Sequence, residues 1–168
     1  DSASAQVIAE TDYDSRAQPW RSYTFGLLRE TRGYHPAGSL ASVTDGNGHT
    51  TTLTDWYRGV PRRIAFADGT AISATVGAQG WITGVTDANG YTTSYAYDAL
   101  GRLQKLTPPA GDSVSWTPTT LAFVPVSSTE YGIGAGHWRR TEARGNYRRV
   151  SYYDALWRPV GRAGVTLT

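Results

Sequence analysis

Few residues in this chain have the types and spacing that chemistry requires. The three histidines, His35, His49 and His137, belong to no HExxH or GxSxG motif, and no two of them are closely spaced. The chain has 0 cysteines, which excludes a thiolate nucleophile, a thiolate metal site and a disulfide scaffold. We therefore predict no catalytic residue, no metal site and no cofactor, and thus a protein that is not an enzyme.

The aspartates recur in a pattern that indicates structure. Asp45 and Asp87 each stand where a turn opens, and Asp98 and Asp154 each follow a tyrosine and can accept bonds from the backbone of the next reversal. A pair of carboxylates could hydrolyse glycosides, but residues repeated along a chain are poor candidates for a site that occurs once. Calcium at the Asp-x-Asn segments 45–47 or 87–89 would lack the remaining acidic ligands of a loop site.

The elements around these aspartates are strands and turns, seen most clearly in residues 85–106, VTDANGYTTSYAYDALGRLQKL. Asn89-Gly90 predicts a type I′ hairpin turn, which needs positive φ at both central residues. In the segment that follows, alternation places Tyr95 and Tyr97 on one face of a strand. Asp98 to Gly101 then reverses the chain before a second strand begins near Arg102.

This unit repeats. Residues 43–51 lie over residues 85–93 with Asp45 on Asp87, and a degenerate third copy at 152–158 matches 97–102, with Trp157 in the place of Gly101. The interval from one copy to the next follows from the two aspartates (87 − 45 = 42). We expect two reversals of direction in each such unit, with one hairpin taking roughly 20 residues.

Two stretches, DANGYTTSYAYDALGRL and YYDALWRPVGR, resemble the tyrosine–aspartate (YD) repeats of the Rhs family, which are similar to repeats in the B and C components of insecticidal toxin complexes and in teneurins. The resemblance covers residues 39–162 and is strongest over 81–107. It implies a spiralling antiparallel sheet that closes into a hollow shell around a toxin or other cargo polypeptide, in a secreted or surface-displayed bacterial protein. The family's shells commonly end in a self-cleaving segment with an Asp-Pro core; this chain has no Asp-Pro, so self-cleavage is not implied. The residues that carry the repeat signature are Asp45, Asn47, Gly48, Asp87, Asn89, Gly90, Tyr95, Tyr97, Asp98, Gly101, Arg102, Tyr153, Asp154 and Arg158.

No apolar pattern of helical period lasts long enough to predict a helix, and 19 glycines favour turns. We predict an all-β fold: repeated antiparallel β-hairpins that form a curved, twisted YD-repeat sheet, a segment of a shell-like spiral. Residues 1–38 would be lead-in strands and 39–168 the repeat hairpins, with copies at 39–80, 81–122 and about 137–162. Because Pro125 cannot donate to a ladder, Leu121–Val124 is expected to be an edge strand or a connecting loop.

The chain has 0 methionines, so we expect that Asp1 is not a translation start and that the chain is processed or a fragment. No apolar run approaches the length of a membrane span. A few hairpins cannot close a shell, and both end strands would expose unpaired backbone groups. We expect the partners to be neighbouring YD repeats of a longer chain, or identical copies joined edge to edge.

Six tryptophans and eleven tyrosines leave a second function open. In the favoured interpretation these rings stack across strands. In the alternative, a carbohydrate-binding module, an exposed stripe that includes Trp56, Trp81 or Trp116 would bind a glycan or a partner surface. Seven arginines between Arg139 and Arg162 could contact phosphates, but a net charge of +2 gives weak long-range attraction, so we expect no nucleic-acid partner.

Overall fold

The computed structural model describes residues 7–111 and 116–163. All the regular elements in these ranges are β-strands. The chain divides into two compact units, Asp1–Gly90 and Tyr91–Thr168. Within the part described, no helix is long and apolar enough to cross a membrane. The predicted all-β class is confirmed.

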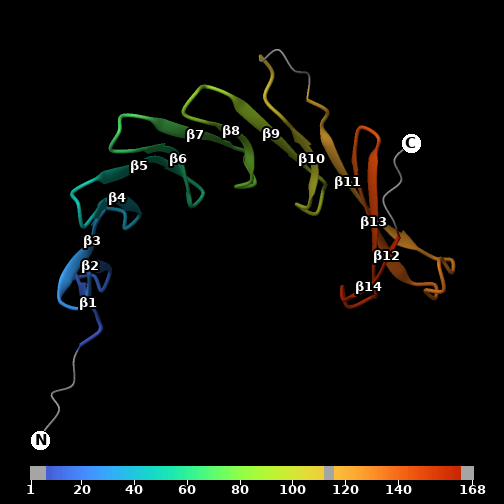
Figure 1. Cartoon of the computed structure of the whole chain (residues 1–168), viewed down its shortest axis with the longest axis horizontal. Helices are drawn as coiled ribbons and strands as arrows, with labels where there is room; N and C mark the ends of the chain where they lie inside the picture. The colour runs from blue at the N-terminus through green and yellow to red at the C-terminus, as the bar shows by residue number, and fades with distance from the viewer. Residues whose placement is uncertain (1–6, 112–115, 164–168) are drawn as a thin grey trace, which may run out of the picture. The chain divides into compact units, whose positions relative to one another are not determined.

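Consecutive strands of the first unit pair antiparallel with one another (Figure 1). These strands are β1 (Ala9–Tyr13), β2 (Pro19–Thr24), β3 (Leu27–Tyr34), β4 (Leu40–Asp45), β5 (Thr50–Tyr57), β6 (Val60–Ala65), β7 (Ala71–Val76) and β8 (Ile82–Thr86). The second unit is built in the same way. Its strands are β9 (Thr92–Tyr97), β10 (Leu103–Thr107), β11 (Thr119–Val126), β12 (His137–Arg144), β13 (Tyr147–Tyr153) and β14 (Pro159–Ala163).

Most of the short connections are tight turns closed by two backbone hydrogen bonds. In the turn that begins at Asp98, its amide donates to the Arg102 carbonyl at 2.9 Å, and the Gly101 amide donates to the Asp98 carbonyl at 3.0 Å. Gly101 has a φ of 77°, the left-handed conformation that follows a type I turn in three-residue hairpin loops. Glycine adopts it without the Cβ clash of other residues.

The predicted type I′ turn at Asn89-Gly90 is wrong. Gly90 has a φ of 85°, but Asn89 is not among the residues with positive φ. The Asp87 carboxylate accepts the Asn89 amide at 2.9 Å, which holds Asn89 in a type I conformation and makes this turn the same kind as that at Asp98. Positive φ at both central residues occurs instead at Phe25-Gly26, Arg58-Gly59 and Tyr131-Gly132.

The turns recur at a regular interval on one side of the meander. Asp45, Phe66 and Asp87 begin successive turns there, and the two intervals are equal (66 − 45 = 21 and 87 − 66 = 21). Residues 39–80 therefore contain four strands, β4 to β7, and not the pair that two reversals would give. The hairpin length expected from the sequence agrees with this interval.

A β-bulge follows five of the turns on the other side. In the pairs β1–β2, β3–β4, β7–β8, β9–β10 and β13–β14, the register shifts at the second residue of the later strand. On the first side, β2–β3 also has a shift, whereas β4–β5 and β6–β7 run without one. The bulged residues of the five pairs are Trp20, Ala41, Thr83, Gln104 and Val160. An extra residue on one strand bends it and increases the local twist, so each of these hairpins is bent on the same side.

Pro125 lies in β11 at a position where its missing amide breaks no hydrogen bond of the described ladder. The Val126 carbonyl accepts the Gly136 amide at 2.9 Å and so faces β12, which turns the backbone of Pro125, one residue earlier, toward the opposite edge. On that edge β10 pairs with Thr119 and Thr120. On the other edge β12 pairs with the whole of β11. The expectation of an edge strand or a connecting loop at Leu121–Val124 is wrong for the strand as a whole, because β11 lies between β10 and β12, although these four residues pair with β12 alone. The missing proline donor lies where the described ladder does not need it.

The sheet has very little core. Among the described residues the buried apolar side chains are Val126 and Tyr152, and the buried polar ones are His137 and Ser151. The chain exposes 11331 Å². A compact monomer of 18.2 kDa would expose about 8,100 Å². Backbone ladders and contacts between neighbouring strands, more than layered packing, therefore hold this fold.

Candidate functional site

The aspartate turns share one constellation of polar contacts. Asp98 Oδ1 accepts the amides of Leu100 at 2.9 Å and Arg102 at 3.0 Å, and Oδ2 accepts Arg102 Nε at 2.7 Å. Asp154 makes the same three bonds, to Leu156 at 2.9 Å and to the amide and Nε of Arg158 at 3.0 and 2.7 Å. Donation by the backbone amide of the fifth residue lowers the pKa of both carboxyls below the ordinary aspartate value.

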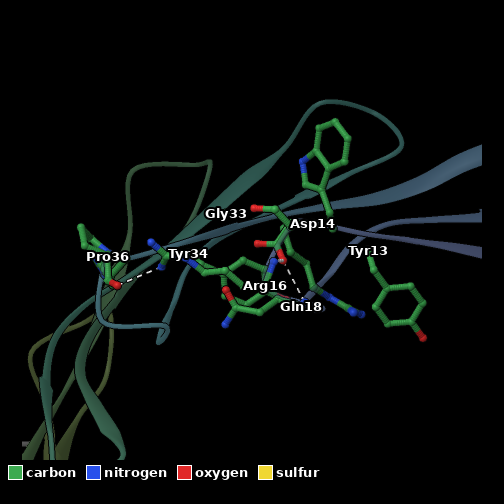
Figure 2. Close-up of a pocket in the computed structure, with 11 residues that line it drawn as sticks. Tyr13, Asp14, Arg16, Gln18, Gly33, Tyr34 and Pro36 are labelled. Carbon is green, nitrogen blue, oxygen red and sulfur yellow. Dashed lines mark hydrogen bonds between the residues drawn. The ribbon is translucent and has the colours of Figure 1, made fainter.

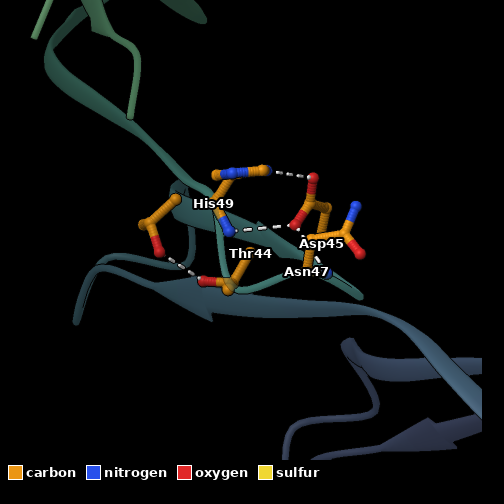
Figure 3. A network of polar contacts seen from close by, with 5 residues as sticks. Thr44, Asp45, Asn47 and His49 are labelled. Carbon is orange, nitrogen blue, oxygen red and sulfur yellow. Dashed lines mark hydrogen bonds and ion pairs between the residues drawn. The ribbon is translucent and has the colours of Figure 1, made fainter. Parts of the chain in front are cut away.

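Asp45 shows the same constellation with histidine as the donor (Figure 3). Its Oδ1 accepts the amides of Asn47 and His49, each at 2.9 Å, and its Oδ2 accepts His49 Nδ1–H at 3.1 Å. The amide of His49 lowers the Asp45 pKa. Gly48, with a φ of 86°, takes the left-handed position. His49 thus belongs to the turn, in the place that arginine takes at residues 102 and 158.

The signature tyrosines stand just before these turns. Tyr95 and Tyr97 lie in β9, with Tyr97 preceding Asp98, and Tyr153 ends β13 before Asp154. Tyr95 pairs with Leu106, and Tyr97 with Leu103, across the β9–β10 ladder. The Tyr153 ring lies 6.1 Å from the Trp157 ring between centroids.

An aromatic cluster covers Arg102, and sequence reasoning missed it. The Arg102 guanidinium carbon lies 4.7 Å from the Phe123 ring centroid and 5.9 Å from that of Trp138. Trp138 stacks on Trp157 with centroids 5.0 Å apart and an angle of 21°. Arg102, Phe123 and Trp138 come from three successive parts of the meander, so only the pairing of β10, β11 and β12 brings them together.

In the first unit, side chains also join the turn at 14–18 to the turn at 35–39, which is the next turn on the same side (Figure 2). Arg16 Nη1 donates to the Pro36 carbonyl, and Gln18 Nε2 to the Gly38 carbonyl, both at 2.9 Å. Tyr34 Oη donates back to the Pro19 carbonyl at 2.6 Å. Arg16, Gln18, Tyr34 and Pro36 line an open hollow together with Tyr13 and Asp14, among others. Because its donors already bond backbone carbonyls of the adjoining hairpin, the hollow serves to join hairpins.

The three predicted platform tryptophans have different surroundings. Trp56 is half-buried and donates from Nε1 to the Leu40 carbonyl at 2.9 Å. Trp81 is half-buried and closes the turn at 77–81. Trp116 is 49% exposed, and the Arg144 guanidinium carbon lies 5.8 Å from its ring centroid. Trp56 and Trp116 lie in different compact units, so the sequence interpretation of one shared stripe stays a prediction.

Several of the seven arginines from Arg139 to Arg162 have ion-pair partners within the second unit. Arg139 pairs with Glu130 at 2.7 Å, Arg140 with Glu142 at 3.5 Å, and Arg158 with Asp154 at 2.7 Å. His137 is buried and donates from Nδ1 to the Gly134 carbonyl at 2.8 Å. Over the residues that the structure describes, no group of three or more His, Cys, Asp or Glu could hold a metal ion.

Comparison with known proteins agrees with this geometry. Residues 78–113, which contain the turns at Asp87 and Asp98, match the RHS Repeat family. The resemblance to the Rhs family is confirmed. No curated protein matches the chain.

Solved structures of toxin-complex proteins are similar to this chain. The crystal structure of TcdB2-TccC3-Cdc42 has a TM-score of 0.50 and 12% identity, and the match covers 92% of this chain and 8% of that chain. The Photorhabdus luminescens Tc holotoxin pore with a TccC3-D651A mutation has a TM-score of 0.30 and 9% identity, covering 94% of this chain and 12% of that chain. The chain thus spans a small part of the length of the structures that it matches.

Proposed function

We propose that this chain is a non-enzymatic structural scaffold, a segment of a YD-repeat shell in a secreted or surface-displayed bacterial protein. The observation that carries the proposal is the single layer of strands with almost no core. All the regular elements of the described residues are strands, and Val126 and Tyr152 are their buried apolar side chains, so within each described unit no second layer packs on the sheet. A layer of this kind suits a wall that encloses something, and a cargo polypeptide is the occupant expected for one face.

The two outer strands supply the means of continuing the wall. In the pairing that the structure describes, β1 has β2 as its one neighbour and β14 has β13. Unpaired strand edges add further strands readily. We propose that neighbouring YD hairpins of a longer chain, or identical copies, pair there. In this proposal residues 39–80, 81–122 and 137–162 are successive copies, and residues 1–38 lead into them.

The test is light scattering with electron microscopy on the purified chain over a concentration series. We expect association that rises with concentration, and rods or rings in the images. Val160→Lys, which places a charge on β14, should weaken association, whereas Leu100→Lys, at another exposed apolar position but in a turn, should not. A monomer at every concentration, with slowly exchanging amides in β1 and β14, would contradict the proposal.

The carbohydrate-binding alternative has a separate readout. A lectin would bind oligosaccharides in a glycan screen and lose binding on a single Trp→Ala change at residue 56, 81 or 116. The bond from Trp56 Nε1 to the Leu40 carbonyl favours a structural role for this tryptophan. We therefore expect Trp56→Ala to lower stability with no effect on glycan binding.

A further inference from the structure

Two turns of the second unit are alike within themselves and differ in their surroundings. In both, arginine Nε donates to aspartate Oδ2 at 2.7 Å. The Arg102 side chain is 25% exposed, whereas the Arg158 side chain is 71% exposed. The aspartates are almost equally exposed, at 23% and 25%, so the difference concerns the arginines.

What covers Arg102 is the hairpin that follows it. Phe123 on β11 and Trp138 on β12 place their rings 4.7 and 5.9 Å from its guanidinium carbon. A guanidinium within about 6 Å of a ring centroid is attracted by the ring face. Among the described residues no strand follows β14, and Arg158 makes no cation–π contact of the kind that Arg102 makes.

The first unit shows the same contact of a turn with the next hairpin. Gln18, the fifth residue of the turn at Asp14, donates to the Gly38 carbonyl at 2.9 Å. His35, which begins the following turn on that side, donates from Nε2 to the Leu53 carbonyl at 3.1 Å. The side chains of these turns thus reach forward to the hairpin that comes next, whether the partner is a ring or a carbonyl.

The surface around Arg158 is apolar. Trp157 stacks on Trp138 and is still 45% exposed, and Leu156 and Val160 beside it are exposed as well. Trp157 and Val160 stand where Gly101 and Gln104 stand beside Arg102, so the surface beside Arg158 offers more exposed apolar area to a further ring than the surface beside Arg102.

We propose that Arg158 and the exposed part of Trp157 form a docking site for an aromatic side chain on a strand that pairs antiparallel with β14, and that a second copy of this chain supplies it through β1. The inference rests on the proposed scaffold function and names the contact that makes its edge specific. β1 carries Tyr13, which is 63% exposed. Tyr13 precedes Asp14 just as Tyr153 precedes Asp154. When β1 of the second copy pairs antiparallel with β14, it runs parallel to β13 of the first copy. Its Tyr13 and the turn at Asp14 therefore lie at the same end of the joined sheet as Tyr153 and Arg158.

The test is sedimentation velocity of the full chain over a concentration series. Arg158→Gln and Tyr13→Ala should each weaken association roughly five- to tenfold, the effect of losing one cation–ring contact. Glutamine at this position has a precedent in Gln18, whose backbone amide donates to Asp14 Oδ1, so the variant keeps the amide bond of the turn while removing the cation. Arg162→Ala removes the same charge from β14 and should change association less than about twofold.

The double variant distinguishes a direct contact from two separate effects. Tyr13→Ala with Arg158→Gln should be no weaker than either single variant, because both remove one shared interaction. If the wild type associates and neither substitution weakens that association, the docking site is overturned and the scaffold proposal stands. A wild-type chain that stays monomeric overturns the docking site and the edge assembly together. Circular dichroism of each variant confirms that the sheet is retained.

Discussion

At the scale of single residues, Trp157 combines strain and stacking. It occupies the left-handed position of its turn with a φ of 61°, where Gly101 stands in the sister turn with a φ of 77°. For a residue with a Cβ this conformation costs about 1–2 kcal/mol. The stacking on Trp138, at 5.0 Å, and the nearby Tyr153 and Phe123 rings offset that cost.

Trp157→Gly and Trp157→Ala separate the two effects. Both remove the ring, but only alanine retains the backbone strain, so we expect wild type to be the most stable and glycine to exceed alanine by about 1 kcal/mol. Urea unfolding of both variants measures the difference. Gly101→Ala is the matched control and should cost about 1 kcal/mol by the backbone effect alone. Equal stability of the glycine and alanine variants would show that the backbone at Trp157 is unstrained.

The turn residues show how far sequence reasoning reaches at this scale. Asp45, Asp87 and Asp98 could be recognised as turn residues because an aspartate accepts nearby amides in any turn of this kind. The turn type at Asn89-Gly90 could not, because Asn-Gly suits both a type I′ turn and the end of a type I turn with a left-handed glycine. The Asp87 side chain decides between them, and a dipeptide preference does not include it.

At the scale of elements, Gly46 fixes how closely a turn approaches the neighbouring strand. A Cβ at this position would lie 2.9 Å from the Leu28 carbonyl oxygen in β3, a backbone atom that cannot swing away. The equivalent residue of the next copy is Ala88. The two copies therefore differ at a position where Gly46 leaves no room for a Cβ.

Gly46→Ala should destabilise the chain by about 1–3 kcal/mol, the usual cost of forcing an extra group into packed surroundings. Ala88→Gly, the reverse change in the next copy, should cost at most about 1 kcal/mol. Thermal unfolding followed by circular dichroism compares the two. If Gly46→Ala is the milder change, the approach of the turn to β3 is not tight.

Strand positions were easier to predict than the bulges. The alternation in residues 92–97 predicts β9, and the Rhs resemblance predicts antiparallel neighbours. The bulges at Gln104 and Val160 leave no mark in the alternation, because one extra residue just after a turn lies where neither face has yet been established. The cluster on Arg102 was missed for a related reason: Phe123 lies a whole hairpin further along the chain, and only the register of β10 and β11 brings it opposite Arg102.

At the scale of the whole molecule, the aspartate turns couple stability to pH. Hydrogen bonds lower the pKa of Asp45, Asp68, Asp98 and Asp154 below the ordinary value of 3.8, chiefly from backbone amides at three of them and from the Thr70 hydroxyl at Asp68. A carboxyl with a lower pKa in the folded state stabilises that state above the unfolded pKa and loses this contribution as the pH falls through the folded pKa. We expect the melting temperature to be level from neutral pH to about 5 and to fall steeply below the ordinary aspartate value.

The double variant Asp98→Asn/Asp154→Asn tests the cause of the acid effect. Asparagine can still accept the turn amides through Oδ1 but does not titrate, so the fall in melting temperature at acid pH should become shallower. An unchanged acid profile would mean that other carboxyls control the transition. Differential scanning calorimetry at several pH values measures both profiles.

The regular spacing of the turns has a consequence for how such a chain can change in length. Side chains alternate between the two faces of a strand, so inserting one residue within a strand would move all later side chains of that strand to the other face. Inserting one full interval between successive turns of the same side, such as that from Asp45 to Phe66, would add one complete hairpin, and every later residue would keep its face. Growth by whole hairpins is therefore the change that keeps the sheet intact. Gene duplication in multiples of this interval can lengthen the sheet, and the existing contacts change only at the point of insertion.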